Sequence, residues 1–290
     1  MHRILVTGSN GQLGSEIREL TKNDVTNVYF YTDVTELDIT NKSAVNTFIE
    51  NHQIDIVVNC AAYTQVDKAE DDEKTAFLIN ATAPGNLAES CKKYEVTLFH
   101  ISTDYVFDGS NNVPYIETES TSPLGVYGRS KLEGEEFIQQ SGCNYLIIRT
   151  SWLYSSFGNN FVKTIARLSS EKDELKVVFD QIGTPTYARD LATVIFAIIQ
   201  NDQFKDRKGV YHYSNEGVCS WYDFAKAIND LFGNNCNIIP CHSDEFPAKV
   251  PRPHYSVLDK TNIKNDFSIE IGYWKDSLCK CVELLKQNNS

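Results

Sequence analysis

The 290 residues suffice for one large domain or two modest ones, and 41% of them are hydrophobic, which is typical of a globular protein and excludes disordered and low-complexity classes. With 27 Lys and Arg against 39 Asp and Glu, the net charge is −12. Nucleic acids and anionic membranes would be repelled by this charge, so we expect neither as a partner. An anionic ligand must therefore be held by local hydrogen-bond donors.

The cellular compartment of the protein is predicted from features that are absent from the sequence. No stretch approaches the roughly 18 consecutive apolar residues that span a bilayer. Residues 1–6 lead into a predicted strand without the pattern of a secretory leader. The eight cysteines lack the paired spacing of a zinc site, as expected for reduced thiols. We expect a cytoplasmic protein.

The first half of the chain alternates short apolar runs with segments of helical periodicity. Strands are predicted at residues 4–7, 27–31, 55–59, 97–101 and 145–149. Helices are predicted at residues 12–20, 43–51, 74–94 and 128–141. Such alternation produces right-handed βαβ units, so we predict an α/β fold with a Rossmann-type doubly wound parallel sheet.

After residue 152 the alternation weakens. Helices are predicted at 160–168, 188–200 and 221–232, a strand at 210–213, and loops with short strands at 237–240 and 246–254. No linker separates the two halves, so a smaller C-terminal substrate domain is predicted to interleave with the first. We predict a dinucleotide-binding Rossmann domain at 1–172 and 187–215, and the substrate domain at 173–186 and 216–290.

A glycine-rich loop follows the first predicted strand and opens the first helix. Its glycines permit a tight turn and a close approach of the backbone to a pyrophosphate, which the helix N-terminus then holds. The position at the first βα crossover makes this a stronger signal than the glycines alone. We predict that the loop binds the cofactor through Gly8, Asn10, Gly11, Gln12, Leu13 and Gly14.

Further cofactor contacts are predicted at the ends of the next strands. Asp33 ends the second strand, where a carboxylate accepts hydrogen bonds from the adenosine ribose hydroxyls and repels a 2′-phosphate, which favours NADH. The neighbouring residues present no clear bar to NADPH. We also expect contacts with the dinucleotide from Asp38, Ile39, Ala61, Ala62 and Tyr63.

A Tyr and a Lys that are four residues apart, Tyr127 and Lys131, share one face of a predicted helix. An ammonium group beside a phenol favours the phenolate, so we expect Lys131 to lower the pKa of Tyr127 and also to contact the nicotinamide ribose. Thr103 follows a predicted parallel strand, where its hydroxyl would point into the ligand crevice. These three residues are the predicted catalytic group.

The combination of motifs resembles the extended short-chain dehydrogenases/reductases. More narrowly, it resembles the dTDP-4-dehydrorhamnose reductase family over nearly the whole chain. The segments that carry this narrower resemblance are Ser102-Thr103-Asp104-Tyr105-Val106-Phe107, Val66-Asp67-Lys68-Ala69-Glu70, Arg149-Thr150-Ser151-Trp152, Gly158-Asn159-Asn160-Phe161, residues 180–186 and Arg252-Pro253-His254.

The resemblance implies NAD(P)H-dependent reduction of the C4 keto group of dTDP-4-dehydro-β-L-rhamnose, the last step in making an activated sugar for polysaccharides. Tyr127 would give the proton, Thr103 would polarise the carbonyl, and Lys131 would assist. Arg252 is expected to hold the substrate diphosphate. The other expected substrate contacts are Thr103, Asp104, Trp152, Asn160 and Gln181.

The resemblance also implies a possible homodimer and a divalent ion at the dimer contact. Glu16 matches one acidic position of that ion site, but Arg189-Asp190 departs from the pattern, so Mg²⁺ is possible and not expected to be essential. Two alternatives stay open: a related nucleotide-sugar 4-epimerase or 4,6-dehydratase, and a non-catalytic nucleotide-binding regulatory subunit. Tyr105 stands where the dehydratases have a Glu, and the intact catalytic group argues against the regulatory subunit.

Overall fold

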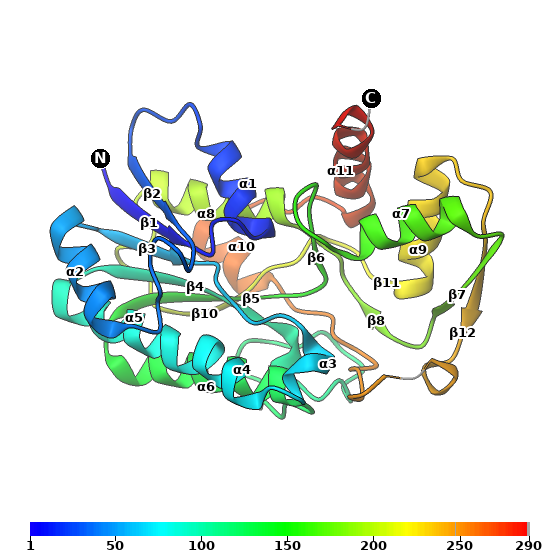
Figure 1. Cartoon of the computed structure of the whole chain (residues 1–290), viewed down its shortest axis with the longest axis horizontal. Coiled ribbons are helices and arrows are strands. Elements are labelled where there is room, and N and C mark those ends of the chain that lie inside the picture. Colours follow the sequence, from blue (N-terminus) through cyan, green and yellow to red (C-terminus); the bar gives the residue numbers. More distant parts are fainter. Residues whose placement is uncertain (247, 289–290) are drawn as a thin grey trace.

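The computed structural model describes residues 1–246 and 248–288, which form two lobes side by side (Figure 1). Residue 247 of the predicted 246–254 run and residues 289–290 of the predicted 216–290 segment lie outside the described residues. Within the described residues, no helix combines the length and the apolar character that crossing a membrane requires.

The larger lobe is built on a six-stranded parallel sheet with the order β10-β5-β4-β3-β1-β2. Its strands are nearly continuous in apolar residues because helices cover both faces. The strands are β1 (Arg3–Thr7), β2 (Val28–Thr32), β3 (Ile56–Asn59), β4 (Thr97–Thr103), β5 (Asn144–Thr150) and β10 (Gly209–His212). The predicted doubly wound parallel sheet is confirmed.

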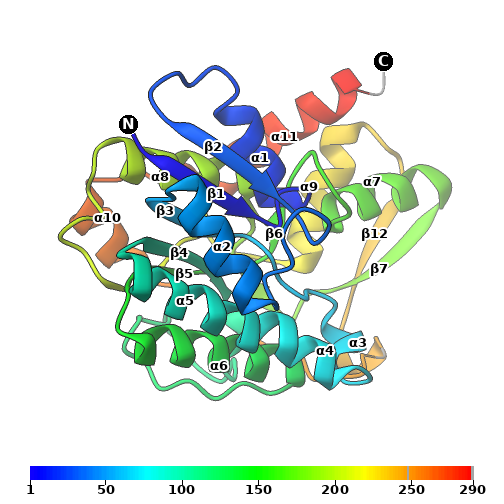
Figure 2. The same ribbon diagram turned by 60° about the vertical axis from the view of Figure 1, so that its left-hand side comes forward.

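Two apolar cores lie on the two faces of this sheet. One face is covered by α1 (Gln12–Leu20), α8 (Ala188–Gln200) and α10 (Thr261–Phe267). The other face is covered by α2 (Lys42–His52), α5 (Ala83–Tyr94) and α6 (Val126–Ser141), which lie together in Figure 2. Because the strands are parallel, their carboxyl ends share one edge of the sheet, where ligands of such folds bind.

The smaller lobe packs three helices around its own apolar core, namely α7 (Phe161–Glu171), α9 (Trp221–Phe232) and α11 (Trp274–Asn288). Its short strand pairs are β7 (Glu174–Val178) with β12 (Asn237–Cys241), β8 (Ile182–Gly183) with β11 (Cys219–Ser220), and β6 (Leu153–Tyr154) with β9 (Thr186–Tyr187). Three further short segments are α3 (Val66–Ala69), η2 (Asp104–Val106) and η3 (Ser243–Glu245).

Core packing groups two helices differently from the predicted domain boundaries. Helix α7 places Val162 and Ile165 in the core of the smaller lobe, although the prediction assigned residues 1–172 to the Rossmann domain. Helix α10 places Ile263 and Phe267 in the core of the larger lobe, although it falls within the predicted 216–290 segment. We therefore propose a division in which α7 belongs to the smaller lobe and α10 to the larger.

The single helix predicted at 74–94 is wrong. The segment forms α4 (Glu73–Phe77), the π-helical turn η1 (Leu78–Thr82) and then α5. Pro84 has no N–H, so it cannot donate the helical bond to the carbonyl of Asn80. A widened turn at this place accommodates the missing bond, and such π turns are frequent at functional sites.

Candidate active site

The glycine-rich loop connects β1 to α1 and lies against the end of β3. Gly8 has a φ of +61°, and a Cβ there would come within 2.6 Å of the Ala61 backbone. A Cβ on Gly14 would come within 2.6 Å of the Gly8 carbonyl oxygen. Gly11 is the N-cap of α1, and a glycine brings no side chain to cover the first N–H groups of the helix. The loop therefore fits a bound pyrophosphate.

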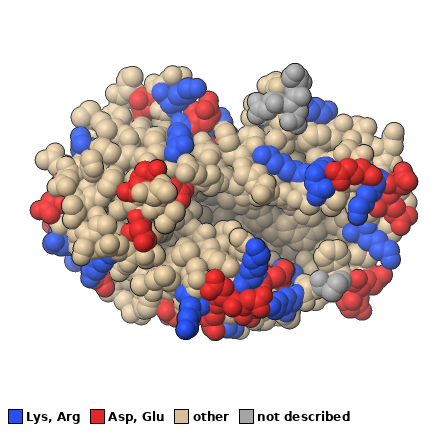
Figure 3. Space-filling model, viewed as in Figure 1, with Lys and Arg blue, Asp and Glu red and all other residues tan. Residues whose placement is uncertain are grey.

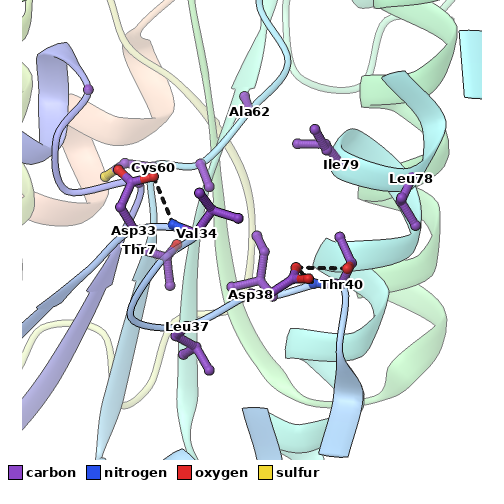
Figure 4. Close-up of a pocket in the computed structure, with 14 residues that line it drawn as sticks. Thr7, Asp33, Val34, Leu37, Asp38, Thr40, Cys60, Ala62, Leu78 and Ile79 are labelled. Carbon is purple, nitrogen blue, oxygen red and sulfur yellow. Dashed lines mark hydrogen bonds between the residues drawn. The ribbon is translucent and has the colours of Figure 1, made fainter. Parts of the chain in front are cut away.

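A cavity of about 440 Å³ opens beside this loop at the carboxyl edge of the sheet. Its lining includes five residues that the sequence predicts as cofactor contacts, Asp33, Asp38, Ile39, Ala61 and Ala62, in addition to Gly8 and Gly11 of the loop. Figure 4 shows Asp33 and Asp38 entering from one side, and Leu78 and Ile79 of η1 facing them from the other. The η1 residues were missed because residues 74–94 were predicted as one regular helix, without the π turn.

Asp33 accepts two backbone hydrogen bonds, one of which ties it to the loop. Its carboxylate accepts from the backbone N–H of Asn10 at 3.2 Å and from that of Val34 at 2.9 Å. Arg18, which sequence reasoning missed, donates to Ser9 Oγ at 2.7 Å and to Asn10 Oδ1 at 3.4 Å. A carboxylate and a guanidinium thus both contact Asn10 at the cavity's edge.

The remaining predicted cofactor residues are placed differently. Leu13 is buried in the core of the larger lobe, so only its backbone is available to a ligand at the loop. Gln12 Oε1 accepts a hydrogen bond of 3.0 Å from Asn160, which ties the loop to the smaller lobe. Asn80 of η1 clamps the Tyr63 backbone, accepting from its N–H at 2.8 Å and donating to its carbonyl at 3.0 Å.

The predicted catalytic group comes together where β4 ends beside α6. Lys131 is buried on α6 and Tyr127 is partly buried on the same helix, and Tyr127 forms a hydrogen bond with the Thr103 side chain. Thr103 Oγ1 also donates to Asp104 Oδ1 at 3.0 Å and accepts from the Tyr105 N–H at 3.2 Å. These contacts fix the hydroxyl of Thr103 next to the phenol.

The expected effect of Lys131 on Tyr127 is not found. Burial raises the pKa of Tyr127 to about 12, with the Thr103 hydrogen bond lowering it and Asp104 raising it. Burial lowers the pKa of Lys131 to about 8, while Glu135 and Cys60 act in the opposite direction. The Lys131 Nζ donates to the Ile101 carbonyl at 2.6 Å instead of approaching the phenol. Tyr127 therefore stays protonated at neutral pH, as a proton donor must.

Helix α6 is held in place by close backbone approaches and a buried ion pair. A Cβ on Gly128 would lie 2.3 Å from the Tyr105 carbonyl oxygen, and one on Gly134 would lie 2.1 Å from that of Asn80. Glu135 pairs with Arg149 of β5 at 2.7 Å, and both side chains are almost fully buried. The helix therefore cannot move away from β4 and η1 without breaking these contacts.

The smaller lobe contributes an aromatic wall that includes the predicted contact Trp152. The Trp152 ring stacks on Trp221 with centroids 3.6 Å apart and planes 9° apart. Trp152 has a φ of +47°, a conformation that costs energy for a bulky residue and is retained where the surroundings dictate it. Gly183 leaves room for the ring, because a Cβ there would lie 2.6 Å from Trp152.

Four other predicted substrate contacts have partners within the chain. Arg252 pairs with Asp67 at 2.6 Å, and its Nη1 is buried without a hydrogen-bond partner in residues 1–246 and 248–288. Gln181 donates to Ser243 Oγ at 2.9 Å. Asn160 caps α7 by accepting from the Lys163 N–H, so its amide is largely engaged.

Asp104, the fourth of these contacts, is a buried carboxyl group beside Thr103. Burial raises the pKa of Asp104 to about 6, although hydrogen bonds from Ser256 and Thr103 oppose the rise. Arg252 is close enough to Tyr105 to lower the pKa of that phenol, against the larger effect of burial, which raises it. The Tyr105 ring lies 5.4 Å from the Tyr127 ring, so Arg252 belongs to the surroundings of the catalytic group. Figure 3 shows a hollow between the lobes with a mainly uncharged visible lining.

The surroundings of Glu16 do not fit a divalent ion. One carboxylate oxygen accepts from Ser155 Oγ at 2.5 Å, and the other pairs with Arg189 Nε at 2.5 Å. Within the described part of the chain, no group of three or more His, Cys, Asp or Glu side chains is placed to hold a metal ion. The guanidinium of Arg189 already neutralises this buried carboxylate.

The fold and the site together define an extended short-chain dehydrogenase/reductase: a phosphate-binding loop at the first βα crossover, and a Tyr–Lys pair beside a strand-end threonine. The family model described as "RmlD substrate binding domain" matches residues 1–287. The chain belongs to this family, the dTDP-4-dehydrorhamnose reductases, which confirms the resemblance seen in the sequence.

Individual relatives agree over nearly the whole length. A dTDP-4-dehydrorhamnose reductase of Aggregatibacter actinomycetemcomitans is 39% identical over 286 residues, covering 96% of this chain and 97% of that protein. A crystal structure of a dTDP-4-dehydrorhamnose reductase from Clostridium acetobutylicum has a TM-score of 0.93 at 44% identity, covering 98% and 99% of the two chains. One from Bacillus anthracis, in complex with NADP, has a TM-score of 0.92 at 38% identity, with coverage of 98% and 99%.

Proposed function

We propose that the chain is an NAD(P)H-dependent oxidoreductase that reduces the C4 keto group of dTDP-4-dehydro-β-L-rhamnose to give dTDP-β-L-rhamnose. The observation that carries the proposal is the hydrogen-bonded pair of Tyr127 and Thr103 at the end of β4. It stands at the same sheet edge as the phosphate-binding loop. The reductase names of full-length relatives support the substrate.

A reduced nicotinamide supplies the hydride when it is bound. Tyr127 then donates its proton to the oxygen of the substrate carbonyl, which neutralises the charge that develops there. Thr103 fixes the phenol, and its hydroxyl, which donates to Asp104 Oδ1, would turn to donate to the same oxygen. Trp152 and Trp221 provide an apolar face for the sugar ring and exclude water from one side of it.

The substrate diphosphate needs a cation in a chain of net charge −12. We assign this role to Arg252, whose Nη1 is unused among the described residues and whose position is close to Tyr105. Asp67 holds the guanidinium through Nη2, so a bound diphosphate would share it or displace Asp67. Gln181 and Asn160 stay predicted contacts, with Asn160 limited by its capping role.

Both nicotinamide cofactors are compatible with the site. Asp33 favours NADH, because its carboxylate would repel a 2′-phosphate. Arg18 brings a positive charge to Asn10 at the same edge of the cavity and offsets part of that repulsion. We propose that NADH is preferred and that NADPH is tolerated.

The cellular setting follows from the same function. We propose a cytoplasmic enzyme that works as a homodimer and binds no nucleic acid, since activated sugars are made in the cytoplasm and the chain is strongly acidic. Cross-linking and size-exclusion chromatography of the purified chain test the dimer. A monomer at every concentration would contradict it.

The reductase and its alternatives differ in how much NADH they consume per product. A 4-epimerase would regenerate its cofactor, and a regulatory subunit would bind nucleotide without turnover. A 4,6-dehydratase would also consume no NADH, and Tyr105 replaces the Glu that such enzymes use. Purified protein with dTDP-4-dehydrorhamnose and NADH should consume one NADH per product. Turnover without a net loss of NADH would reject the reductase.

The proton donor is tested by Tyr127→Phe, which we expect to lower kcat by about 10²-fold or more. Tyr94→Phe is the matched control, because this phenol is on α5 and bonds the surface residue Glu50. The control should keep parental kcat. Equal rates for parent and Tyr127→Phe would remove Tyr127 from the mechanism.

A further inference from the structure

Buried polar side chains form a row beneath Lys131, across three neighbouring strands. The sheet register sets Thr7 of β1 beside Asn59 of β3, and Asn59 beside His100 of β4. All three side chains are at most 1% exposed, as is Lys131 of α6. In the interior such groups are stable only when their hydrogen-bond donors and acceptors match, so the row has a defined direction.

The direction is set at Asn59. Its Oδ1 accepts from Thr7 Oγ1 at 2.7 Å and from the backbone N–H of Ala61 at 3.2 Å. The amide NH₂ of Asn59 therefore faces His100, with Nδ2 3.0 Å from Nδ1 of the ring. An amide NH₂ only donates, so Nδ1 must accept, and the neutral imidazole carries its proton on Nε2.

The protonated nitrogen of His100 faces the catalytic lysine. Nε2 lies 3.3 Å from Lys131 Nζ, which itself donates to the Ile101 carbonyl at 2.6 Å. An ammonium group has only donors, whereas a neutral amine has a lone pair that accepts from Nε2–H. We propose that His100 is a positioning residue. Asn59 orients the imidazole, and His100 Nε2–H then donates to Lys131 Nζ and thereby favours the neutral amine of Lys131.

The other groups around Lys131 are accounted for. Cys60 after β3 and Glu135 on the next turn of α6 raise the pKa of Lys131, against the larger effect of burial, which lowers it to about 8. Glu135 is itself engaged by Arg149 and by Ser102 Oγ. Burial and the neighbouring Lys131 hold the pKa of His100 well below its ordinary value. The imidazole thus stays neutral, and Asn59 decides which nitrogen carries the proton.

The consequence for catalysis rests on the proposed function. A lysine whose pKa lies near neutrality can hold or release a proton in the pH range where Tyr127 must regain one after each turnover. His100 sets that balance through a hydrogen bond and not through its own charge. Its contribution is therefore visible in the protein without substrate, which separates this proposal from the reductase assignment.

The test is nitrogen NMR of the full-length chain labelled with ¹⁵N-histidine, without substrate. The His100 signals, identified by their loss in His100→Gln, should show the proton on Nε2. A parent protein with the proton on Nδ1 would overturn the proposal. This measurement needs no active variant, and the proposed function would fail separately, as a lack of NADH-dependent turnover.

Two variants extend the test to Lys131, whose titration is followed by NMR of ¹³C-lysine-labelled protein. Asn59→Asp turns the partner of Nδ1 into an acceptor, so the proton should move to Nδ1. His100→Gln offers a carbonyl oxygen to the ammonium and introduces no charge. Each should raise the pKa of Lys131 by about one unit, the size expected of one hydrogen bond. Asn112→Asp, on an exposed loop, is the control for added charge and should leave it unchanged. An unchanged Lys131 titration in both variants would refute the proposal.

Discussion

Gly134 allows the helix that carries Tyr127 and Lys131 to contact η1, and Gly134→Ala should break that contact. The added Cβ would lie 2.1 Å from the Asn80 carbonyl oxygen and 3.5 Å from Ala81 Cα. Carbon and carbonyl oxygen normally approach to about 3.3 Å, so α6 and η1 must separate by about 1 Å. Because backbone opposes the methyl group, no side-chain rotation relieves the clash, and we expect a loss of about 1–3 kcal/mol in unfolding free energy.

The same displacement should reduce activity. Leu78 and Ile79 of η1 line the cofactor cavity, while α6 holds the catalytic pair. Misplacement of catalytic groups by about 1 Å can cost roughly 10²-fold in rate, so kcat should fall by about that factor. Urea unfolding gives the stability change, and the loss of NADH absorbance with saturating substrate gives kcat.

Gly85→Ala on α5 is the matched control. Its Cβ would lie 3.3 Å from Cβ and Cδ2 of the partly exposed Phe137, a contact that a small shift of Phe137 relieves. Replacing a helical glycine with alanine favours the helix by up to about 1 kcal/mol, so this variant should be as stable as the parent or more stable. If Gly134→Ala matched the parent in both urea midpoint and kcat, the packing argument would be wrong.

Four further predictions concern charged groups and metal removal. The folded protein holds the proton of Asp104 more tightly than the unfolded chain, since the pKa of this group rises from 3.8 to about 6 on folding. The unfolding free energy of the parent should therefore fall by on the order of 3 kcal/mol through this group as the pH rises from 4 to 6. Asp104→Asn has no ionisable group here and avoids this loss. Urea titrations should therefore show that the unfolding free energy of the variant, relative to that of the parent, rises between pH 4 and pH 6, and a fall would contradict the prediction. Asp33→Ser should raise kcat/KM for NADPH relative to NADH by about tenfold, and an unchanged ratio would remove Asp33 from cofactor selection. Activity should persist in EDTA, and a loss that added Mg²⁺ restores would contradict this. Arg189→Met should lower the unfolding free energy by about 3 kcal/mol, because Glu16 would be buried without its cation.

Local patterns predict much of the fold and of the site. Alternating apolar strands and amphipathic helices determine the doubly wound sheet, because each element carries its own periodicity. The glycines of the loop and the spacing of Tyr127 and Lys131 are equally local, so the sequence places them without tertiary information. Asp33 is predicted for the same reason, as it directly follows the second strand.

The remaining features depend on contacts between distant segments. The row from Thr7 to His100 exists only because the sheet register sets three strands side by side, and the stack of Trp152 on Trp221 joins two segments that are far apart in the chain. The expectation that Lys131 lowers the pKa of Tyr127 failed because the Ile101 carbonyl draws the ammonium away. Pro84 was the available sign of the π turn, since it removes one helical hydrogen bond.

Helix α11 has a consequence for synthesis of the chain on the ribosome. It supplies Trp274, Leu278 and Cys281 to the interior of the smaller lobe, whereas the last element of the larger lobe, α10, ends at Phe267. During translation, the larger lobe can assemble while the smaller lobe still lacks part of its interior. A nascent chain halted before α11 emerges should resist protease in the larger lobe and be cut readily in the smaller lobe.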